Sequence, residues 1–313
     1  MPQRYDALTP GANAYFNRKL RYVHPTVLEE QRPPKSFMSL FPISRDVPAT
    51  ALTYEKALME ALGEAKIGTG LETNTNAVSL GLSSEIGNVR LLLLSYGWSV
   101  FELERCAEAG VPLPTKYARA TRDLIEQKHN DIFFDGAEAW GLRGLLTHPL
   151  IPRVTMSEPI SSSASSVAAL IADLKGFMRS SFLLTKTRFQ PTYLGVPPTQ
   201  YGYLADTYRS TTSDLTILDA LKKGAASATA EAEPKNLIVV PIHELEGAGP
   251  NDEDLIMAWT PDKMVARGEI PGGRVFANLA PQASKYRIDV HCYGVNGGFT
   301  CDYPLMIAVG VLP

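Results

Sequence analysis

The clearest pattern of hydrophobic and polar positions lies in residues 161–188. Its apolar residues recur at the spacing i, i+3, i+4 and i+7, which places them on one face of a helix. They are Val167, Leu170, Ile171, Leu174, Phe177 and Met178. The pattern predicts one amphipathic helix over this range, with its apolar face packed on a core.

A longer and more polar helix is predicted over residues 115–132. Tyr117, Ala120 and Leu124 recur at helical spacing, and many of the positions between them are charged. Only a narrow stripe of this helix should therefore be buried, and the rest should face solvent. A shorter helix is predicted just before it, over residues 99–109.

The other regular patterns indicate strands and short helices in mixed order. Strands are predicted over residues 89–96, 191–197, 237–243, 274–280, 286–293 and 305–312, and the first and third are predicted to be buried. Short helices are predicted over residues 199–209 and 214–223. Because strands and helices do not alternate regularly, an α+β fold is favoured over a doubly wound sheet.

Residues 53–88 contain two different patterns. Residues 53–66 predict a short amphipathic helix, with Tyr54, Leu58 and Leu62 on one face. Small polar residues and glycines then dominate residues 67–88, which predict a long hairpin. Long loops in compact chains are usually functional or disordered, so we expect this hairpin to be ordered mainly by a neighbouring molecule.

Residues 1–50 combine frequent prolines with large apolar side chains. Proline removes a backbone donor and restricts the residue before it, so no long helix or strand is predicted here. The apolar side chains are too many for a solvated tail; they are Tyr15, Phe16, Leu20, Tyr22, Val23, Phe37, Met38, Leu40 and Phe41. The pattern predicts an extended arm, packed either on a neighbouring subunit or on its own domain.

Composition narrows the class of protein. The 313 residues are enough for one large domain or two ordinary ones, and 45% hydrophobic with 20% charged residues is typical of a globular protein. No signal peptide is recognisable, and the apolar runs are too short to span a bilayer. Cys106, Cys292 and Cys301 lack paired spacing, so reduced thiols are predicted. A net charge of -3 gives no overall attraction to nucleic acid.

The search for catalytic and metal-binding motifs is negative. The sequence HELEG at His243 begins like a zinc-protease helix, but Gly247 occupies the position of the second histidine. The glycine-rich segment at Gly63 carries Thr69 where a phosphate loop requires lysine. The five histidines are scattered along the chain. No catalytic, cofactor-binding or metal-binding residue is predicted, and no cofactor is expected.

Three segments carry a resemblance to a known family. They read NDIFFDGAEAWGLRGLLTHPLIPRV, PTYLGVPPTQYGYL and FANLAPQASKYRIDVHCYGVNGGFTCDYPLMIAVGV. Together with the arm and the hairpin, they resemble the major capsid proteins of tailed bacteriophages, whose HK97-like fold is shared by encapsulins. One subfamily carries the motif G-L-L-N-H-P, which Leu145, Leu146, His148 and Pro149 match, whereas Thr147 replaces the usual asparagine.

The resemblance implies a division of the chain into the parts of that α+β capsid fold. These are an extended N-arm at 1–50, a helix leading into the P-domain at 51–64, an E-loop hairpin at 65–92, a P-domain at 93–136 with its spine helix at 115–132, an A-domain at 137–267, and strands returning to the P-domain and A-domain at 268–313. The stretch from Gly136 to Gly144 then becomes the passage from the spine helix to the A-domain.

The function implied by the resemblance is structural, not enzymatic. Copies of the chain would assemble into pentamers and hexamers of an icosahedral head shell around the phage double-stranded DNA, which the inner face would contact non-specifically. Further expected partners are a scaffolding protein, the portal and a decoration protein, with no membrane. The expected location is the capsid head of the virion, assembled in the host bacterial cytoplasm.

The arm and the hairpin supply the residues expected at contacts between subunits. They are Tyr15, Phe16, Arg18, Arg21, Phe37, Phe41, Glu72, Asn74, Asn76, Leu80 and Glu85. The basic residues of the arm, beside aromatic ones, could instead contact nucleic acid. Some members of the fold cross-link an E-loop lysine to a neighbouring subunit; residues 68–88 contain no lysine, so no such bond is expected. Because the sequence begins at Met1, we also expect no N-terminal cleavage and a separate scaffolding protein.

Two alternatives remain open from the sequence. An encapsulin-like nanocompartment would share the fold, but those shells usually begin with a helix that receives a cargo peptide, and this chain begins with a proline-broken arm. A soluble α+β enzyme would have to assemble its site from distant residues such as Asp135, His148 and His243.

Overall fold

The computed structural model describes residues 33–63, 79–110, 112–186, 188–209, 214–225 and 237–313. Residues 35–313 form one compact unit. The predicted arm therefore lies mostly outside the described residues, and so does the middle of the predicted hairpin.

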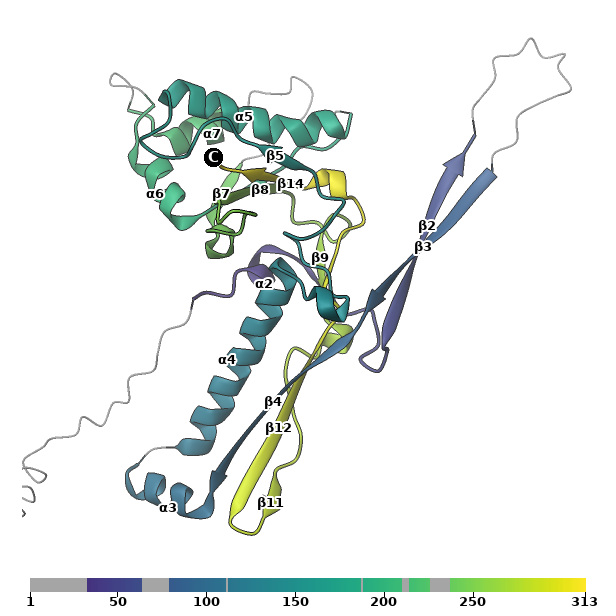
Figure 1. Cartoon of the computed structure of the whole chain (residues 1–313), viewed down its shortest axis with the longest axis vertical. Coiled ribbons are helices and arrows are strands. Elements are labelled where there is room, and N and C mark those ends of the chain that lie inside the picture. Colours follow the sequence, from purple (N-terminus) through teal and green to yellow (C-terminus); the bar gives the residue numbers. More distant parts are fainter. Residues whose placement is uncertain (1–32, 64–78, 111, 187, 210–213, 226–236) are drawn as a thin grey trace, which may run out of the picture. The chain divides into compact units, whose positions relative to one another are not determined.

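A five-stranded sheet with helices on one face forms the first part of the fold (Figure 1). Its strands, in spatial order, are β5 (Arg153–Thr155), β14 (Ala308–Val311), β8 (Leu255–Trp259), β6 (Tyr193–Val196) and β7 (Ile238–Pro241). The helices are α5 (Val167–Leu184), α6 (Pro198–Asp206) and α7 (Ile217–Ala225). The predicted apolar face of α5 is confirmed, because Leu170, Leu174 and Phe177 are buried in the core between helices and sheet. Strand β8, which the sequence patterns did not predict, is buried along its whole length.

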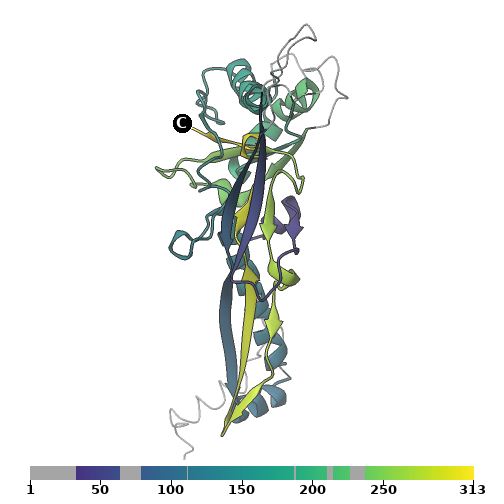
Figure 2. The same ribbon diagram turned by 90° about the vertical axis from the view of Figure 1, so that its right-hand side faces the viewer.

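A long helix against a long strand pair forms the second part. Strands β4 (Arg90–Ser99) and β12 (Arg287–Asn296) are antiparallel over ten residue pairs, and the short strands β10 (Ala277–Asn278) and β11 (Gln282–Ser284) pair with β12. Helix α4 (Leu113–Phe134) runs along this pair, preceded by α3 (Val100–Glu108) (Figures 1 and 2). Both helices were predicted, and the predicted strand over residues 286–293 is confirmed within β12.

The buried faces of α4 and β4 differ from the predicted ones. Helix α4 buries Thr121, Ile125 and His129, whereas Leu124 is 42% exposed, so the buried stripe lies one residue further along than predicted. Strand β4 was predicted to be buried, but its residues alternate, and Leu93 is exposed. Only one face of β4 therefore belongs to the core.

A cluster of aromatic rings joins the two parts. Helix α2 (Phe37–Leu40) and strand β1 (Ile43–Ser44) place Phe37 and Phe41 in this cluster, and β1 pairs with β9 (Arg267–Glu269), which also pairs with β13 (Phe299–Thr300). The ring of Phe37 stacks on Phe133 with centroids 4.5 Å apart and on Phe41 at 4.7 Å. Burial of several rings gives this cluster a large share of the apolar area removed from water.

A turn of closely packed glycines follows α4. Gly136 has a φ of +80°, and a Cβ on Gly144 would lie 2.2 Å from the backbone nitrogen of Gly136, so neither position has room for a side chain. Thr147 donates a hydrogen bond to the Asp135 carbonyl (2.9 Å), so this threonine stabilises the turn directly. Four short 3-10 helices complete the described elements: η1 (Glu138–Trp140), η2 (His243–Leu245), η3 (Pro271–Gly273) and η4 (Pro304–Met306).

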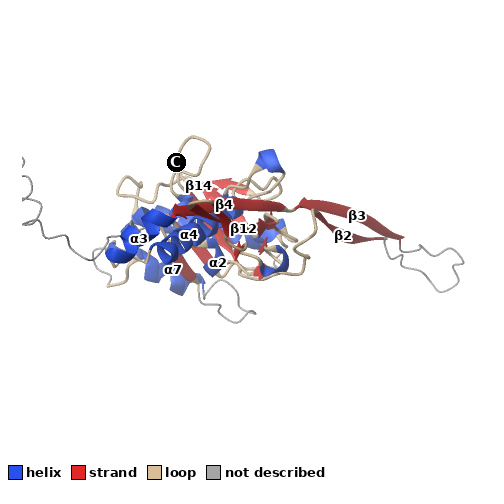
Figure 3. Ribbon diagram, turned by 90° about the horizontal axis from the view of Figure 1, so that it is seen from below, coloured by secondary structure: helices blue, strands red, loops and turns tan. Residues whose placement is uncertain are grey.

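The helix predicted over residues 53–66 is wrong. This segment forms strand β2 (Thr53–Leu62), which pairs with β3 (Ser79–Asn88) in antiparallel register from Thr53 opposite Asn88 to Leu62 opposite Ser79. The hairpin predicted from residue 67 thus begins at Thr53. The pair forms a two-stranded sheet of its own, and it extends outward from the rest of the unit (Figure 3).

Candidate assembly surface

One face of the β2–β3 hairpin is apolar and exposed. Directly paired residues of antiparallel strands share a face, and Met59 on β2 is paired with Leu82 on β3. Met59 is 67% exposed and Leu82 is 71% exposed. Leu80 and Ile86 are even-numbered residues of β3, as Leu82 is, so they lie on the same face, and they are also exposed. The face thus presents large apolar side chains that the described part of the chain leaves in water.

From Leu92 onward, the even-numbered residues of β4 are also apolar, but there helix α4 covers them. After Val89, the even-numbered residues Leu92, Leu94, Tyr96 and Trp98 pack in a core with Tyr117 and Ile125 of α4. Figure 2 shows β3 leading into β4. The even-numbered apolar positions are therefore packed beneath a helix in β4 and uncovered in β3.

The root of the hairpin is its end at Thr53 and Asn88, and the rest of the compact unit is called the body. On the face opposite the apolar one, the root contacts the body through Tyr54. Its ring lies against Gly87 of the paired strand, because a Cβ there would lie 2.1 Å from Tyr54 Cζ. Its hydroxyl donates to the carbonyl oxygen of Gly297 (3.1 Å). Burial raises the pKa of Tyr54 well above its usual range, and the carboxylates of Glu269 and Glu85 raise it further. The hydroxyl therefore stays protonated and remains a donor.

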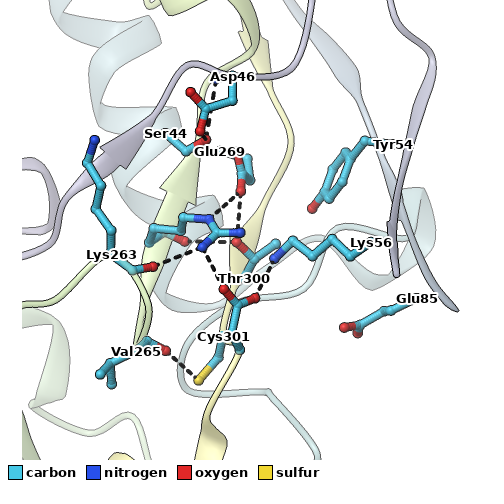
Figure 4. Close-up of polar contacts among 12 residues, drawn as sticks. Ser44, Asp46, Tyr54, Lys56, Glu85, Lys263, Val265, Glu269, Thr300 and Cys301 are labelled. Carbon is cyan, nitrogen blue, oxygen red and sulfur yellow. Dashed lines mark hydrogen bonds and ion pairs between the residues drawn. The ribbon is translucent and has the colours of Figure 1, made fainter. Parts of the chain in front are cut away.

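Lys56 reaches a network of ion pairs beside Tyr54 (Figure 4). Lys56 Nζ lies 3.0 Å from Asp302 Oδ1, and the other oxygen of Asp302 accepts from Arg267 Nη1 at 2.6 Å. Arg267 Nε also donates to Glu269 Oε1 (2.8 Å), and Thr300 Oγ1 donates to the same oxygen (3.1 Å). Asp302 is thus shared between a lysine of the hairpin and an arginine of the body.

Glu85 forms the second ion pair at the root, with the guanidinium of Arg143. A pocket lies beneath these contacts, lined among others by Tyr54, Lys56, Arg143 and His148. Burial lowers the pKa of His148, and the nearby Arg143 lowers it further, so this imidazole is neutral at neutral pH. The hairpin root therefore touches the body mainly through polar side chains around a pocket.

The start of the described chain is fixed on α4 and η2. Lys35 Nζ pairs with Asp123 (3.0 Å) and Glu126 (2.6 Å) of α4. The backbone nitrogen of Phe37 donates to Asn130 Oδ1 (3.0 Å), and Ser36 donates to Glu244. The point at which the chain enters the unit is thus held by several charged and polar contacts.

The structure separates the residues predicted for contacts between subunits into three groups. Phe37 and Phe41 are 0% and 3% exposed inside the aromatic cluster, so their prediction is wrong: their own chain leaves no surface for a neighbour. Leu80 is exposed on the hairpin, and Glu85 binds Arg143 at its root. The others lie outside the described residues; they are Tyr15, Phe16, Arg18, Arg21, Glu72, Asn74 and Asn76.

Sequence reasoning missed the other members of this surface. Met59, Leu82 and Ile86 belong to the exposed apolar face, and Lys56 with Asp302 belongs to the root. The alternation of Leu80, Leu82 and Ile86 was the available signal for a strand with one apolar face. Nothing in the sequence indicated that Lys56 would meet Asp302, because the two residues are far apart along the chain.

The residues of the alternative enzyme site have separate surroundings. His148 accepts a hydrogen bond from the backbone nitrogen of Leu150, and His243 lies 3.4 Å from Glu246. Asp135 ends α4, where burial raises its pKa. Over the described ranges, no three histidine, cysteine or carboxylate side chains come together as metal ligands. Among the helices of those ranges, none combines the length and the apolar character needed to cross a membrane.

Solved structures with the same fold include capsids. The capsid of Myoviridae phage XM1 has a TM-score of 0.80 at 15% identity, covering 95% of this chain and 98% of that one. The capsid of a native GTA particle has a TM-score of 0.63 at 12% identity, covering 98% and 99%. A structure from Mycobacterium phage Adephagia has a TM-score of 0.61 at 12% identity, covering 98% of each chain. At such identities the similarity shows the fold alone, which is the α+β capsid fold expected from the sequence.

Sequence comparison supplies the family. No curated protein sequence matches the chain significantly. The family described as major capsid protein matches residues 63–309, which is most of the 313 residues and includes β3, α4 and all of the five-stranded sheet except the end of β14. The chain belongs to the major capsid protein family.

Proposed function

We propose that this capsid protein assembles through its hairpin into pentamers and hexamers of an icosahedral phage head that encloses double-stranded DNA. Ring-forming contacts join two different surfaces of neighbouring copies, and a hairpin that extends from the body suits such a contact. The protein would act as a wall of the virion head and would catalyse no reaction. Assembly would take place in the cytoplasm of the bacterial host.

The observation that carries this proposal is the uncovered apolar face of the hairpin. Met59, Leu80, Leu82 and Ile86 are exposed together on one face, and the equivalent positions of β4 are covered by α4. Contiguous exposed apolar surface of this kind marks an interaction site. Because a shell surrounds each subunit with copies of itself, another copy is the simplest cover for this face.

The partners expected from the resemblance complete the proposal. Leu80 would contact a neighbouring copy directly, and Glu85 would act at the hairpin root, where it binds Arg143. The residues of 1–32 and 64–78 expected at contacts would add to the same interfaces. A scaffolding protein, the portal and a decoration protein would be further partners, and a net charge of -3 suits a wall that packaged DNA touches without binding tightly. A cargo-enclosing shell of the same fold is less favoured, because the matching family is that of major capsid proteins.

Expression of the full chain, alone and together with the neighbouring genes of its source, tests this function. Analytical ultracentrifugation and electron microscopy should show rings of five or six copies, or closed shells. A chain that remains a monomer or dimer in both arms of the experiment, up to high concentration, would contradict the proposed assembly.

A further inference from the structure

The contact between the hairpin and the body consists mainly of polar groups. Besides Asn88, which donates to the Gly141 carbonyl at the base of β3 (3.4 Å), three side chains make it: Tyr54, Lys56 and Glu85 lie on the face opposite the exposed apolar one. Each meets a polar group of the body: the Gly297 carbonyl, Asp302 or Arg143. The strand pair itself is held by backbone pairing over ten residue pairs, which does not involve these three side chains.

We propose that Tyr54, Lys56 and Glu85 form a latch that sets the angle of the hairpin relative to the body, and that opening this latch lets the strand pair tilt as one piece. The latch is a property of the single chain. Its consequence, that one sequence can place its hairpin differently in pentamers and hexamers, rests on the proposed function.

The body side of the latch is fixed independently of the hairpin. Asp302 remains paired with Arg267 when Lys56 leaves, and Arg267 is held in turn by Glu269, which is 2% exposed. Thr300 donates a further hydrogen bond to Glu269 (Figure 4). Because the receiving carboxylate keeps its position and a charged partner, Lys56 can detach and return without a rearrangement of the body.

On the hairpin side, the ion pair of Glu85 with Arg143 is the more exposed of the two, since the side chains of Lys56 and Asp302 are 16% and 24% exposed. Hydrogen bonds and partly exposed ion pairs can be exchanged for contacts with water at small net cost, whereas apolar packing cannot. The side chain of Glu85 is 35% exposed and that of Arg143 is 48% exposed, so water already reaches this pair. All three latch side chains line the pocket beneath the root.

Tyr54 is placed to act as the pivot. Its ring lies between two glycines: Gly87 of the hairpin, and Gly297 of the body, where a Cβ would lie 3.4 Å from the ring. The ring therefore packs on backbone at both surfaces, and neither glycine has a side chain to interlock with it. The hydroxyl bond to the Gly297 carbonyl then restores one preferred angle.

The distance between spin labels on the hairpin and on the body tests the latch in the full, unassembled chain. Cysteines at Ser83, on the non-apolar face of β3, and at Lys175, on the exposed side of α5, carry the labels in a Cys106→Ser background. Pulsed electron resonance should give one narrow distance distribution. The variant Lys56→Met combined with Glu85→Gln should broaden this distribution. The share of molecules whose hairpin has left its main position should rise about fivefold for each ion pair lost.

Two controls separate a latch from general damage. Lys56→Arg keeps the ion pair with Asp302 and should keep the narrow distribution, and so should Glu55→Gln, which removes an exposed carboxylate from the neighbouring position of β2. If the double variant does not fold, the unmodified chain is measured while salt is raised from about 0.1 to about 1 M, which shortens the screening length to about 3 Å and should broaden the distribution. An unchanged distribution in the folded double variant, or in high salt, would overturn the proposal. Because no shell is needed, this result is independent of whether the chain assembles.

Discussion

Asn296 Nδ2 lies 2.8 Å from His129 Nδ1, in the buried contact between α4 and β12. The other ring nitrogen, Nε2, lies 3.0 Å from the Val275 carbonyl, which can only accept a hydrogen bond. The imidazole therefore carries its proton on Nε2 and accepts from Asn296 on Nδ1. Asn296 Oδ1 in turn accepts from the backbone nitrogen of Gly298 (2.6 Å), so one neutral histidine connects the long helix to the turn at the hairpin root.

The folded chain should lose stability in mild acid because of His129. Burial lowers the pKa of His129 from 6.5 to about 4, opposed by the Val275 hydrogen bond and Glu126. Because the unfolded chain takes up this proton first, the contribution of His129 is complete above pH 6.5 and is lost as the pH falls toward 4. The loss in the free energy of unfolding should be on the order of 3 kcal/mol. Denaturant titrations of the unassembled chain across this range measure it.

The variant His129→Gln isolates this contribution. Glutamine does not titrate, so the difference in unfolding free energy between the two proteins should shrink as the pH is lowered from 7 to 4. A constant difference across the range would show that His129 is not the titrating group.

A side chain at Gly268 should destabilise the folded chain, because this glycine lies against two aromatic rings. A Cβ at this position of β9 would lie 2.9 Å from the rings of Phe133 and Phe37, which are fully buried. Gly268→Ala should therefore lower the free energy of unfolding by about 1–3 kcal/mol, the usual cost of overpacking a core. In the matched control Gly176→Ala, on the exposed side of α5, the new methyl meets nothing within 4 Å and should stabilise by about 0.5–1 kcal/mol. Equal effects of the two substitutions would contradict this account.

Phe37 should stabilise the chain itself, although it belongs to the segment predicted to be an arm. Its ring is stacked on Phe41 and Phe133 and is 0% exposed. Phe37→Ala should lower the free energy of unfolding of the unassembled chain by about 3–5 kcal/mol. Phe101→Ala removes the same atoms from a side chain that is 58% exposed, and it should change that free energy by less than about 1 kcal/mol. Thermal unfolding of both variants checks the difference.

The cysteines should differ strongly in reactivity. Burial raises the pKa of Cys301 to about 12, and its thiol donates to the Val265 carbonyl (2.8 Å). Burial also raises the pKa of Cys292, whereas Cys106 is partly exposed on α3. Since the thiolate is the reactive form, a disulfide reagent at pH 8 should modify Cys106 first and the other two only after unfolding. Cys106→Ser should abolish the fast phase, and a fast phase that persists would count against this assignment.

The sequence predicted long periodic elements well and short or partnered ones poorly. Helix α5 was recognisable because Leu170, Leu174 and Phe177 repeat over several turns and pack on a core within the same chain. The buried stripe of α4 was misplaced because Thr121 and His129 are polar residues whose hydrogen bonds are satisfied in the core. Strand β8 was missed because a short apolar segment has no period of its own.

The hairpin was the hardest element to predict, for a physical reason. Thr53–Leu62 contains glutamate, lysine, alanine, leucine and methionine, all good helix formers, and its apolar residues fit a helical spacing as well as an alternating one. Pairing with Ser79–Asn88 over ten positions overrides this preference, and that pairing is not visible in either segment alone. The contacts of the root escaped prediction for the same reason, because Lys56 and Asp302 meet only in the folded chain.

Assembly of a variant at Leu82 tests the central claim most directly. Leu82→Asp puts a charge on the exposed apolar face, whereas Ser83→Asp puts the same charge on the neighbouring residue of the opposite face. Both side chains are exposed, so both variants should fold with the thermal midpoint of the unmodified chain. Sedimentation velocity with electron microscopy should show rings or shells for the unmodified chain and for Ser83→Asp, and free subunits for Leu82→Asp. Normal shells formed by Leu82→Asp would contradict the claim that the apolar hairpin face is covered by a neighbouring copy.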